Sequence, residues 1–245
     1  MPIIRDISIS DFRCCVWQVT ETMEELLAML PDEGHELYEE AQQRFSSPKR
    51  RQEFIAVRVL LYQMLPGAVI GYYDNGKPYL AHSCWRISIS HTVGYVAVIL
   101  SDCGEVGVDI EQYGERVCRV ASRFINDDER VTGIWKQLLL WSAKETVYKM
   151  MNCCEVDFQE HLISGCWRPQ EISGPGCKGS IQLQTFHPLH QKTYQVSFET
   201  TEIKSVFKSC SIVEVIPLSR LIKSLLISFS STFKSVCLIS SIFIS

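Results

Sequence analysis

The chain has no excess of positive charge, since its 245 residues carry 24 Lys and Arg against 28 Asp and Glu, a formal net charge of −4. Proteins that bind long stretches of nucleic acid need a basic face to attract phosphates, so the charge balance argues against that class of function. Any phosphate must be recognised locally. The composition is otherwise that of an ordinary soluble protein, with 46% hydrophobic and 21% charged residues, which argues against collagen-like, disordered and coiled-coil chains.

The sequence also lacks the usual spacings of zinc ligands, because its 11 cysteines form no Cys-x2-Cys pair and its histidines form no His-x3-His pair. A zinc site is therefore not expected. The opening residues, MPIIRDISIS, lack the basic start and the unbroken apolar run of a signal peptide. We expect a cytoplasmic protein whose cysteines are small buried or incidental thiols.

A long uninterrupted hydrophobic run is missing as well. The last residues, 219–245, consist mostly of Ser, Leu, Ile and Phe, but Lys234 and many serines interrupt them. This pattern is too polar for a membrane span, and we expect no membrane association. We interpret 219–245 as a low-complexity tail to which no function is assigned.

The remaining residues predict an α+β fold in which helix and strands follow one another twice. Helices are expected at 23–30, where Thr22 and Glu25 have capping-box spacing, at 49–65, and from a cap at Asn126 or Asp127 to Met150. Short alternating or apolar runs predict strands at 11–20, 69–73, 85–90, 95–100, 106–111, 180–185, 194–198 and 210–216. The length suits one large domain or two subdomains of about 100 residues each.

The segment Gly107-Val108-Asp109-Ile110-Glu111 is the sharpest chemical feature. Side chains alternate along a strand, so Asp109 and Glu111 project to the same face about 6.6 Å apart, while Val108 and Ile110 face the core. Two carboxylates placed in this way repel each other unless a positive group lies between them. A solvated strand end is the plain alternative.

The segment Trp141-Ser142-Ala143-Lys144-Glu145-Thr146-Val147-Tyr148-Lys149 is the second feature. On a helix Trp141, Glu145 and Lys149 lie along one stripe, because they are four and eight residues apart. Alone, the stripe is an amphipathic helix with one ordinary ion pair. If it faces the strand, Glu145 becomes a third carboxylate, and three hard oxygen ligands suit Mg²⁺, which also accepts phosphate oxygens of a substrate.

A third feature, Ile87-Ser88-Ile89-Ser90-His91-Thr92, ends a strand in two hydroxyls and an imidazole, all of which can donate to phosphate. A single His after a strand is also often structural. The chain has no Gly-x-Ser-x-Gly elbow that would make Ser90 a nucleophile, and we expect neither a Walker nor a dinucleotide-binding glycine motif.

The order ISHT, GVDIE and WSAKETVYK resembles the 4'-phosphopantetheinyl transferase superfamily, in particular its larger, monomeric, surfactin-synthetase-activating type. Upstream, Gly76-Lys77-Pro78-Tyr79 is similar to a Gly-(Lys/Arg)-Pro segment of that family, and Arg58 falls where the family has a CoA-contacting Arg. The resemblance covers about residues 45–160, and Thr146 replaces a usually smaller residue.

The resemblance implies an enzyme that moves 4'-phosphopantetheine from coenzyme A to a serine hydroxyl of an apo acyl or peptidyl carrier protein and releases 3',5'-ADP. Asp109, Glu111 and Glu145 would then be the Mg²⁺ ligands, and either Glu145 or a metal-bound water would remove the serine proton. Lys149 would approach the pyrophosphate and steady the leaving charge.

The same resemblance assigns Arg58, Lys77, Ser90 and His91 to the phosphates of CoA. The basic residues Lys49, Arg50 and Arg51 are further candidates for the 3'-phosphate; a solvated helix start is the alternative for them.

The family fold is two similar α+β subdomains related by a pseudo-twofold axis, with CoA in the cleft between them. The expected division is 1–102, 103–218 with the metal site, and the tail 219–245. A binding module that holds CoA or ADP with Mg²⁺ without transfer, and a membrane-attached interaction protein, are the competing interpretations. The sequence does not tell which carrier protein or pathway is served, or how acyl-CoA is treated.

Overall fold

The computed structural model describes residues 3–9, 12–151, 153, 155–172, 174–203 and 208–215, so the tail 219–245 lies outside the described residues. The helices are α1 (Met23–Leu27), α2 (His35–Arg44), α3 (Pro48–Met64), α4 (Arg116–Val120) and α5 (Ile134–Met150). The strands are β1 (Ile3–Ile9), β2 (Phe12–Gln18), β3 (Ile70–Tyr72), β4 (Pro78–Leu80), β5 (Arg86–Thr92), β6 (Tyr95–Ser101), β7 (Gly107–Gln112), β8 (Leu162–Arg168), β9 (Lys178–Thr185), β10 (Thr193–Ile203) and β11 (Lys208–Val215).

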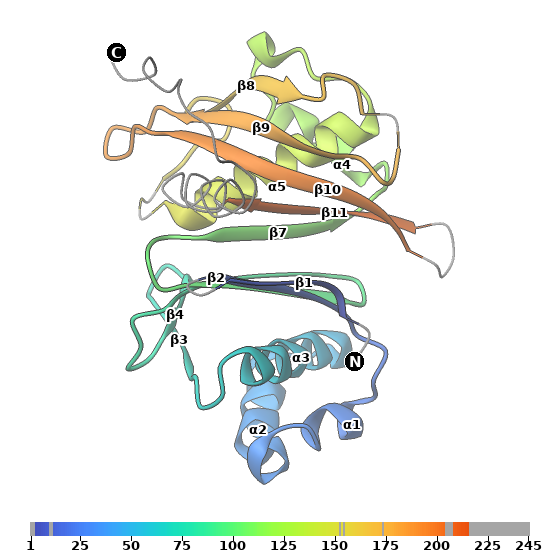
Figure 1. The fold of residues 1–245 in the computed structure, drawn as a ribbon, viewed down its shortest axis with the longest axis vertical. Coiled ribbons are helices and arrows are strands. Elements are labelled where there is room, and N and C mark those ends of the chain that lie inside the picture. Colours follow the sequence, from blue (N-terminus) through green and yellow to red (C-terminus); the bar gives the residue numbers. More distant parts are fainter. Residues whose placement is uncertain are drawn as a thin grey trace, which may run out of the picture.

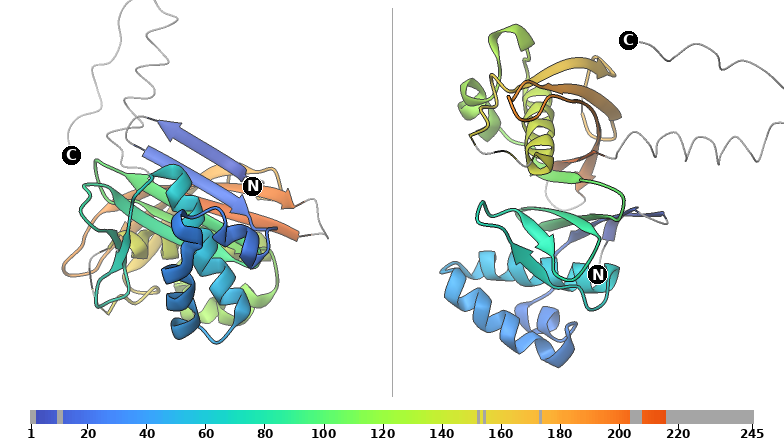
Figure 2. Two further views of the ribbon diagram at one scale, coloured as in Figure 1. Left: turned by 90° about the horizontal axis from the view of Figure 1, so that it is seen from below. Right: turned by 90° about the vertical axis from the view of Figure 1, so that its left-hand side faces the viewer.

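Two antiparallel sheets lie against each other, and helices cover the outer side of each (Figures 1 and 2). The first sheet has the strand order β1-β2-β6-β5 and is covered by α1, α2 and α3. The second has the order β7-β11-β10-β9-β8 and is covered by α5. The chain is therefore a mixed α+β protein, and the pseudo-twofold relation between its halves stays a prediction.

Strand β6 shows why this arrangement suits the sequence, because its apolar residues supply both faces of the first sheet. Val96, Val98 and Leu100 pack with the helices α1 to α3. Tyr95 and Ile99, on the opposite face, pack in a separate core against the strand that contains Val108 and Ile110. An unbroken apolar run is expected for a strand that is buried on both faces.

Close packing of α5 on β7 depends on one glycine. A Cβ atom built on Gly107 would lie 2.3 Å from the carbonyl oxygen of Thr146, which is closer than any real contact. The absence of a side chain at Gly107 therefore lets the helix approach the strand, which brings the charged residues of α5 near those of β7.

Most predicted elements are confirmed, and the Thr22–Glu25 capping box is formed at the start of α1. The predicted helix from Asn126 is wrong at its start. Asn126 caps only a 3-10 turn, Asp127–Glu129, after which Arg130 and Gly133 take positive φ angles of 45° and 83° and interrupt the helical path. Helix α5 begins at Ile134. Strands β1, β4 and β8 and helices α2 and α4 are not among the elements predicted from the sequence.

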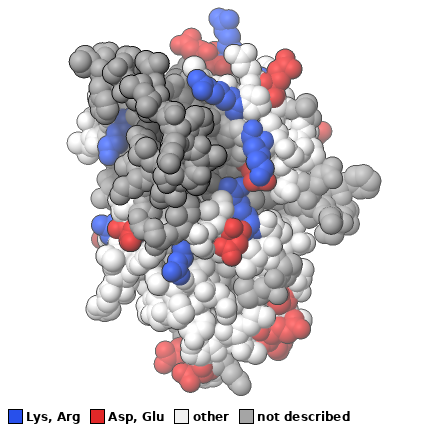
Figure 3. All heavy atoms as spheres, in the orientation of Figure 1, with Lys and Arg blue, Asp and Glu red and all other residues white. Residues whose placement is uncertain are grey.

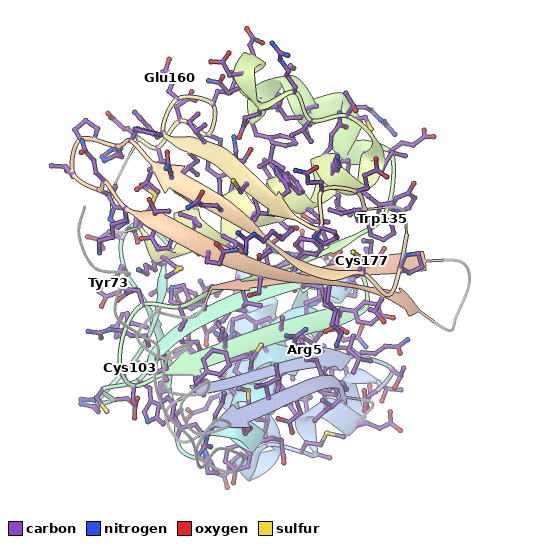
Figure 4. The ribbon with its side chains drawn as sticks, turned by 45° about the horizontal axis from the view of Figure 1, so that its top comes forward. Arg5, Tyr73, Cys103, Trp135, Glu160 and Cys177 are labelled. Carbon is purple, nitrogen blue, oxygen red and sulfur yellow. The ribbon has the colours of Figure 1, made fainter. Side chains whose placement is uncertain are left out.

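The surface mixes charges, as the composition suggests. Figure 3 shows Lys and Arg side chains interspersed with Asp and Glu on one face. Arg5 of β1 lies at the interface of the two sheets (Figure 4), where its guanidinium donates to Glu199 of β10 at 2.6 Å. None of the described helices has the length and hydropathy needed to cross a membrane.

Candidate functional site

Strand β7 and helix α5 bring together the two acidic segments of the sequence. As the alternation predicts, Val108 and Ile110 are buried between the sheets, while Asp109 and Glu111 face α5. The predicted stripe of α5 faces β7: Trp141 contacts Glu111, and Lys149 contacts Asp109. The two features that were separate in the sequence therefore form one site.

Asp109 is only 5% exposed, and two donors converge on one of its oxygens. The Ser90 hydroxyl lies 2.9 Å and the Lys149 ammonium 2.8 Å from Oδ1. The Lys149 ammonium also donates to the carbonyl oxygen of Val108 at 2.9 Å. The other carboxylate oxygen of Asp109, Oδ2, is buried and has no hydrogen-bond partner among the described residues. A buried carboxylate oxygen without a donor is an unusual and costly feature that points to a missing ligand.

Glu111 is oriented by an indole. The Nε1–H group of Trp141 donates to Glu111 Oε1 at 3.2 Å. The Trp141 ring is itself held between Phe124 and Phe158, with ring centroids 5.2 and 5.7 Å away. Burial and the neighbouring charge of Asp109 raise the pKa of Glu111.

Glu145 has the most perturbed carboxylate of the site. Burial raises its pKa to about 7; the Lys149 ammonium opposes this rise, and the charges of Asp109 and Glu111 add to it. The carboxylates are thus close enough to repel one another. A carboxylate with a pKa near neutrality is suited to accept a proton.

His91 lies next to this site and next to a basic residue. Arg50 Nη1 lies 2.8 Å from His91 Nε2, and Glu53 Oε2 lies 3.4 Å from His91 Nδ1. Burial lowers the pKa of His91, and the charges of Lys149 and Asp109 also act on it. Of the basic run at the start of α3, Arg50 approaches His91, whereas Lys49 lines a different cavity.

Arg58 belongs to a cationic cavity of about 540 Å³, which we call the arginine cavity. Arg44, Arg50, Arg58 and His91 line it, together with the acidic residues Glu53 and Asp74. The Arg58 guanidinium is buried 3.2 Å from the centre of the Phe54 ring, donates to the Tyr72 hydroxyl, and has its pKa lowered by burial. Arg44 was missed in the sequence, because an Arg in a polar amphipathic helix gives no signal of its own.

Lys77 lies in a second cavity, of about 230 Å³, which we call the lysine cavity because Lys149 also lines it. The Lys77 ammonium donates to Glu105 Oε2 at 2.8 Å, and Glu105 also pairs with Arg86. An anionic ligand of Lys77 would therefore compete with Glu105.

A third cavity, of about 650 Å³, is the carboxylate cavity. Glu111 and Glu145 line it beside Trp141 and Tyr148, and Arg116, Arg123 and Asp157 also contribute to its lining. The three cavities adjoin: Gly76 and Pro78 line both the arginine and the lysine cavity, and Tyr148 lines both the lysine and the carboxylate cavity. The three cavities therefore form a series in which arginines, then lysines, then carboxylates contribute to the lining.

The donor set suits Mg²⁺ without forming a complete cage. Among the described residues, no three His, Cys, Asp or Glu side chains are arranged to enclose a metal ion by themselves. Mg²⁺ usually keeps several waters and needs only one or two protein carboxylates together with substrate phosphates. The unpartnered Oδ2 of Asp109 and the neighbouring carboxylates match this requirement.

Lys144 has a different role from its neighbours in the same motif. Its ammonium is fully buried, where it pairs with Glu129 at 2.7 Å and donates to the carbonyl oxygens of Phe124 and Phe158. Lys144 therefore attaches α5 to the segments around it. The sequence alone does not separate this structural lysine from Lys149.

The expectation that no dinucleotide glycine spacing occurs is wrong, because Gly174-x-Gly176-x-x-Gly179 has it, but this segment leads into strand β9 and not into a helix. The amide of Gly176 donates to the carbonyl oxygen of Thr200. Without a helix N-terminus this loop lacks the feature that binds a pyrophosphate, so it is structural.

No protein-family model matches the chain. Over 118 residues the chain is 30% identical to the 4'-phosphopantetheinyl transferase AcpT of Salmonella typhimurium (strain LT2). The match covers 41% of this chain and 58% of the relative, so the chain spans little more than half the length of the protein it matches. The similarity supports a distant relation to the 4'-phosphopantetheinyl transferase superfamily and does not distinguish the larger type from others.

Proposed function

We propose that the protein transfers 4'-phosphopantetheine from coenzyme A to a serine hydroxyl of an apo carrier protein in a Mg²⁺-dependent reaction. The observation that carries the proposal is the series of three cavities with shared lining residues, because arginines, lysines and carboxylates contribute to them in the order that CoA would require. The arginine cavity suits the 3'-phosphate and the lysine cavity the pyrophosphate, whose pantetheine-bearing phosphorus would then lie toward Glu111 and Glu145 of the carboxylate cavity. The similarity to AcpT supports the same class of transfer.

The chemistry follows from these positions. The serine oxygen of the carrier bonds to the phosphorus that bears the pantetheine, and the bond from that phosphorus to 3',5'-ADP breaks. The serine proton passes to Glu145, whose pKa of about 7 suits a general base. Lys149 stabilises the charge on the departing 3',5'-ADP. Asp109 and Glu111, with Glu145, would hold Mg²⁺, which when bound neutralises pyrophosphate charge.

The alternative is a module that binds CoA or ADP with Mg²⁺ and transfers nothing. The direct experiment incubates the protein with CoA, Mg²⁺ and a panel of apo acyl and peptidyl carrier proteins and measures intact mass. A phosphopantetheine mass gain on a carrier, lost with Glu145→Gln, supports transfer. CoA binding by calorimetry without any mass gain supports the binding module.

The pH dependence of the reaction should report Glu145. Its carboxyl must be ionised to accept a proton, so kcat/KM should rise as the pH increases through about 7, and the midpoint should move lower at higher Mg²⁺, which favours the ionised form. Transfer rates between pH 5.5 and 8.5 at two Mg²⁺ concentrations test this. A flat profile would contradict the assignment.

The contribution of Glu145 to the free energy of unfolding should decrease over the pH range in which kcat/KM increases. Burial raises the pKa of Glu145 in the folded state to about 7, above its ordinary value, so its contribution favours folding at low pH and is lost as the pH rises through about 7. Glu145→Gln should therefore raise the melting temperature at pH 8 and change it little at pH 5.

Lys77 and His91 should act on binding more than on turnover. Contacts to phosphates far from the reacting phosphorus bind ground and transition states almost equally, so Lys77→Met and His91→Ala should each raise the KM for CoA about tenfold and change kcat little. Glu105→Gln is the matched control, because it frees Lys77 from its ion pair and should lower KM. A fall in kcat at unchanged KM would instead place His91 at the reacting phosphorus.

A further inference from the structure

The two sheets are joined at their facing edges by serine hydroxyls. Strand β5 ends the first sheet, and strand β7 ends the second. The backbone amide of Val108 donates to Ser88 Oγ at 3.3 Å, and that of Ile110 donates to Ser90 Oγ at 3.2 Å. Both serines are buried, and each supplies the acceptor that a neighbouring strand would otherwise give.

Ser90 differs from Ser88 in the hydrogen bond that its hydroxyl group donates. Because Ser90 Oγ already accepts from Ile110, its single proton is available to Asp109 Oδ1, which lies 2.9 Å away and can only accept. The bonds therefore run in one direction, from the Ile110 amide through Ser90 to Asp109. Lys149 donates to the same oxygen.

We propose that Ser90 is a positioning residue that fixes the rotation of the Asp109 carboxylate and leaves Oδ2 free for a divalent cation. With both donors on Oδ1, Oδ2 is the oxygen without a partner among the described residues. Ser90 is 7% exposed and engaged on both sides, which favours this role over the phosphate contact that the resemblance implies. The inference rests on the proposed function, since it assigns Asp109 to the cation.

The test measures cation binding without turnover, using Mn²⁺ as a probe that shares the oxygen preference of Mg²⁺. Free Mn²⁺ is followed by electron paramagnetic resonance during titration of the full chain and of Ser90→Ala, Ser90→Thr and Ser88→Ala. We expect Ser90→Ala to weaken Mn²⁺ binding about tenfold or more, as is typical when the partner of a ligand is removed. Ser90→Thr keeps the hydroxyl and should bind within about threefold of the wild type.

Ser88→Ala is the matched control, because it removes a similar bond to β7 but no bond to Asp109. It should lower the melting temperature about as much as Ser90→Ala and leave Mn²⁺ affinity unchanged. Equal Mn²⁺ affinities for Ser90→Ala and Ser88→Ala would overturn the inference, as would a wild-type chain that binds no Mn²⁺.

Transfer assays on the same variants separate this inference from the proposed function. If the wild type binds Mn²⁺ but modifies no carrier protein, the proposed transfer fails, while the Mn²⁺ titration still decides the role of Ser90. A raised KM for CoA in Ser90→Ala, with unchanged Mn²⁺ affinity, would return Ser90 to a phosphate contact and overturn the positioning role.

Discussion

Asp109→Asn should lower the transfer rate about 10³-fold at low millimolar Mg²⁺, an effect of ~4 kcal/mol on the transition state. The substitution keeps the size of the side chain and an oxygen for Ser90, but it removes the negative charge and one of the two oxygens. The position next to Asp109 Oδ2 then loses its attraction for a cation. The measurement is the rate of carrier-protein mass gain across a Mg²⁺ titration, together with the melting temperature.

Substitutions of two other carboxylates, Glu199 and Glu111, test whether the loss of activity is specific to Asp109. Glu199→Gln is the matched control, because the Glu199 carboxylate also pairs with basic residues, Arg5 and Lys178, but lines none of the three cavities. It should retain most activity. Glu111→Gln should lose less than Asp109→Asn, since Glu111 keeps its bond from Trp141 through the amide oxygen. Normal activity of Asp109→Asn would exclude the site built from Asp109, Glu111 and Glu145.

The centre of this site is visible in the sequence because two regular periods define it. Alternation along β7 puts Asp109 and Glu111 on one face, and the spacing of Trp141, Glu145 and Lys149 gives one helical stripe. Neither periodicity shows that this face of β7 is in contact with this stripe of α5. That contact depends on how α5 packs on the second sheet, for which Gly107 is the only local sign. The resemblance to the 4'-phosphopantetheinyl transferases implies this contact, because it assigns Asp109, Glu111 and Glu145 to one metal ion.

Other features could not be predicted because they depend on contacts between distant segments. The helix start was placed at Asn126 because a capping residue stands there, but the cap serves a 3-10 turn. The interpretation of Ser90 as a phosphate contact rests on its position at a strand end and in the matching motif, and neither shows its bonds to β7, 19 and 20 residues away. Arg44 enters the arginine cavity from α2, which has no motif.

Lys144 is another residue whose contacts with distant segments could not be predicted, and these contacts should have a measurable effect on stability. Its ammonium and the Glu129 carboxylate are both fully buried and 2.7 Å apart. The Glu129 carboxylate also accepts from the amides of Asn126 and Ser164, at 2.8 and 2.7 Å, so this pair links α5 to the 3-10 turn and to β8. Burial lowers the pKa of Lys144, and the Glu129 carboxylate opposes that shift.

Lys144→Met should lower the free energy of unfolding by about 3–5 kcal/mol, because it leaves Glu129 charged and buried without its cation. In a chain of this size the melting temperature should fall by roughly 10 °C or more. The double variant Lys144→Met/Glu129→Gln should recover part of the loss, because the uncompensated charge disappears while the amides of Asn126 and Ser164 keep an acceptor. Urea unfolding of the wild type, both single variants and the double variant gives the coupling energy.

Lys136→Met on the same helix is the control for the loss of a lysine, because Lys136 forms no ion pair with another described residue. It should change the unfolding free energy by less than about 0.5 kcal/mol.

Lys144→Met should also keep much more of its transfer rate than Asp109→Asn when both are assayed well below the melting temperature. The reason is that the Lys144 ammonium bonds to Glu129 and to backbone carbonyls, and not to the carboxylates of the site. A Lys144→Met variant as stable as Lys136→Met would show that the buried pair contributes nothing to the attachment of α5. Equal losses of activity in Lys144→Met and Asp109→Asn, with the fold intact, would place Lys144 in the site with Lys149.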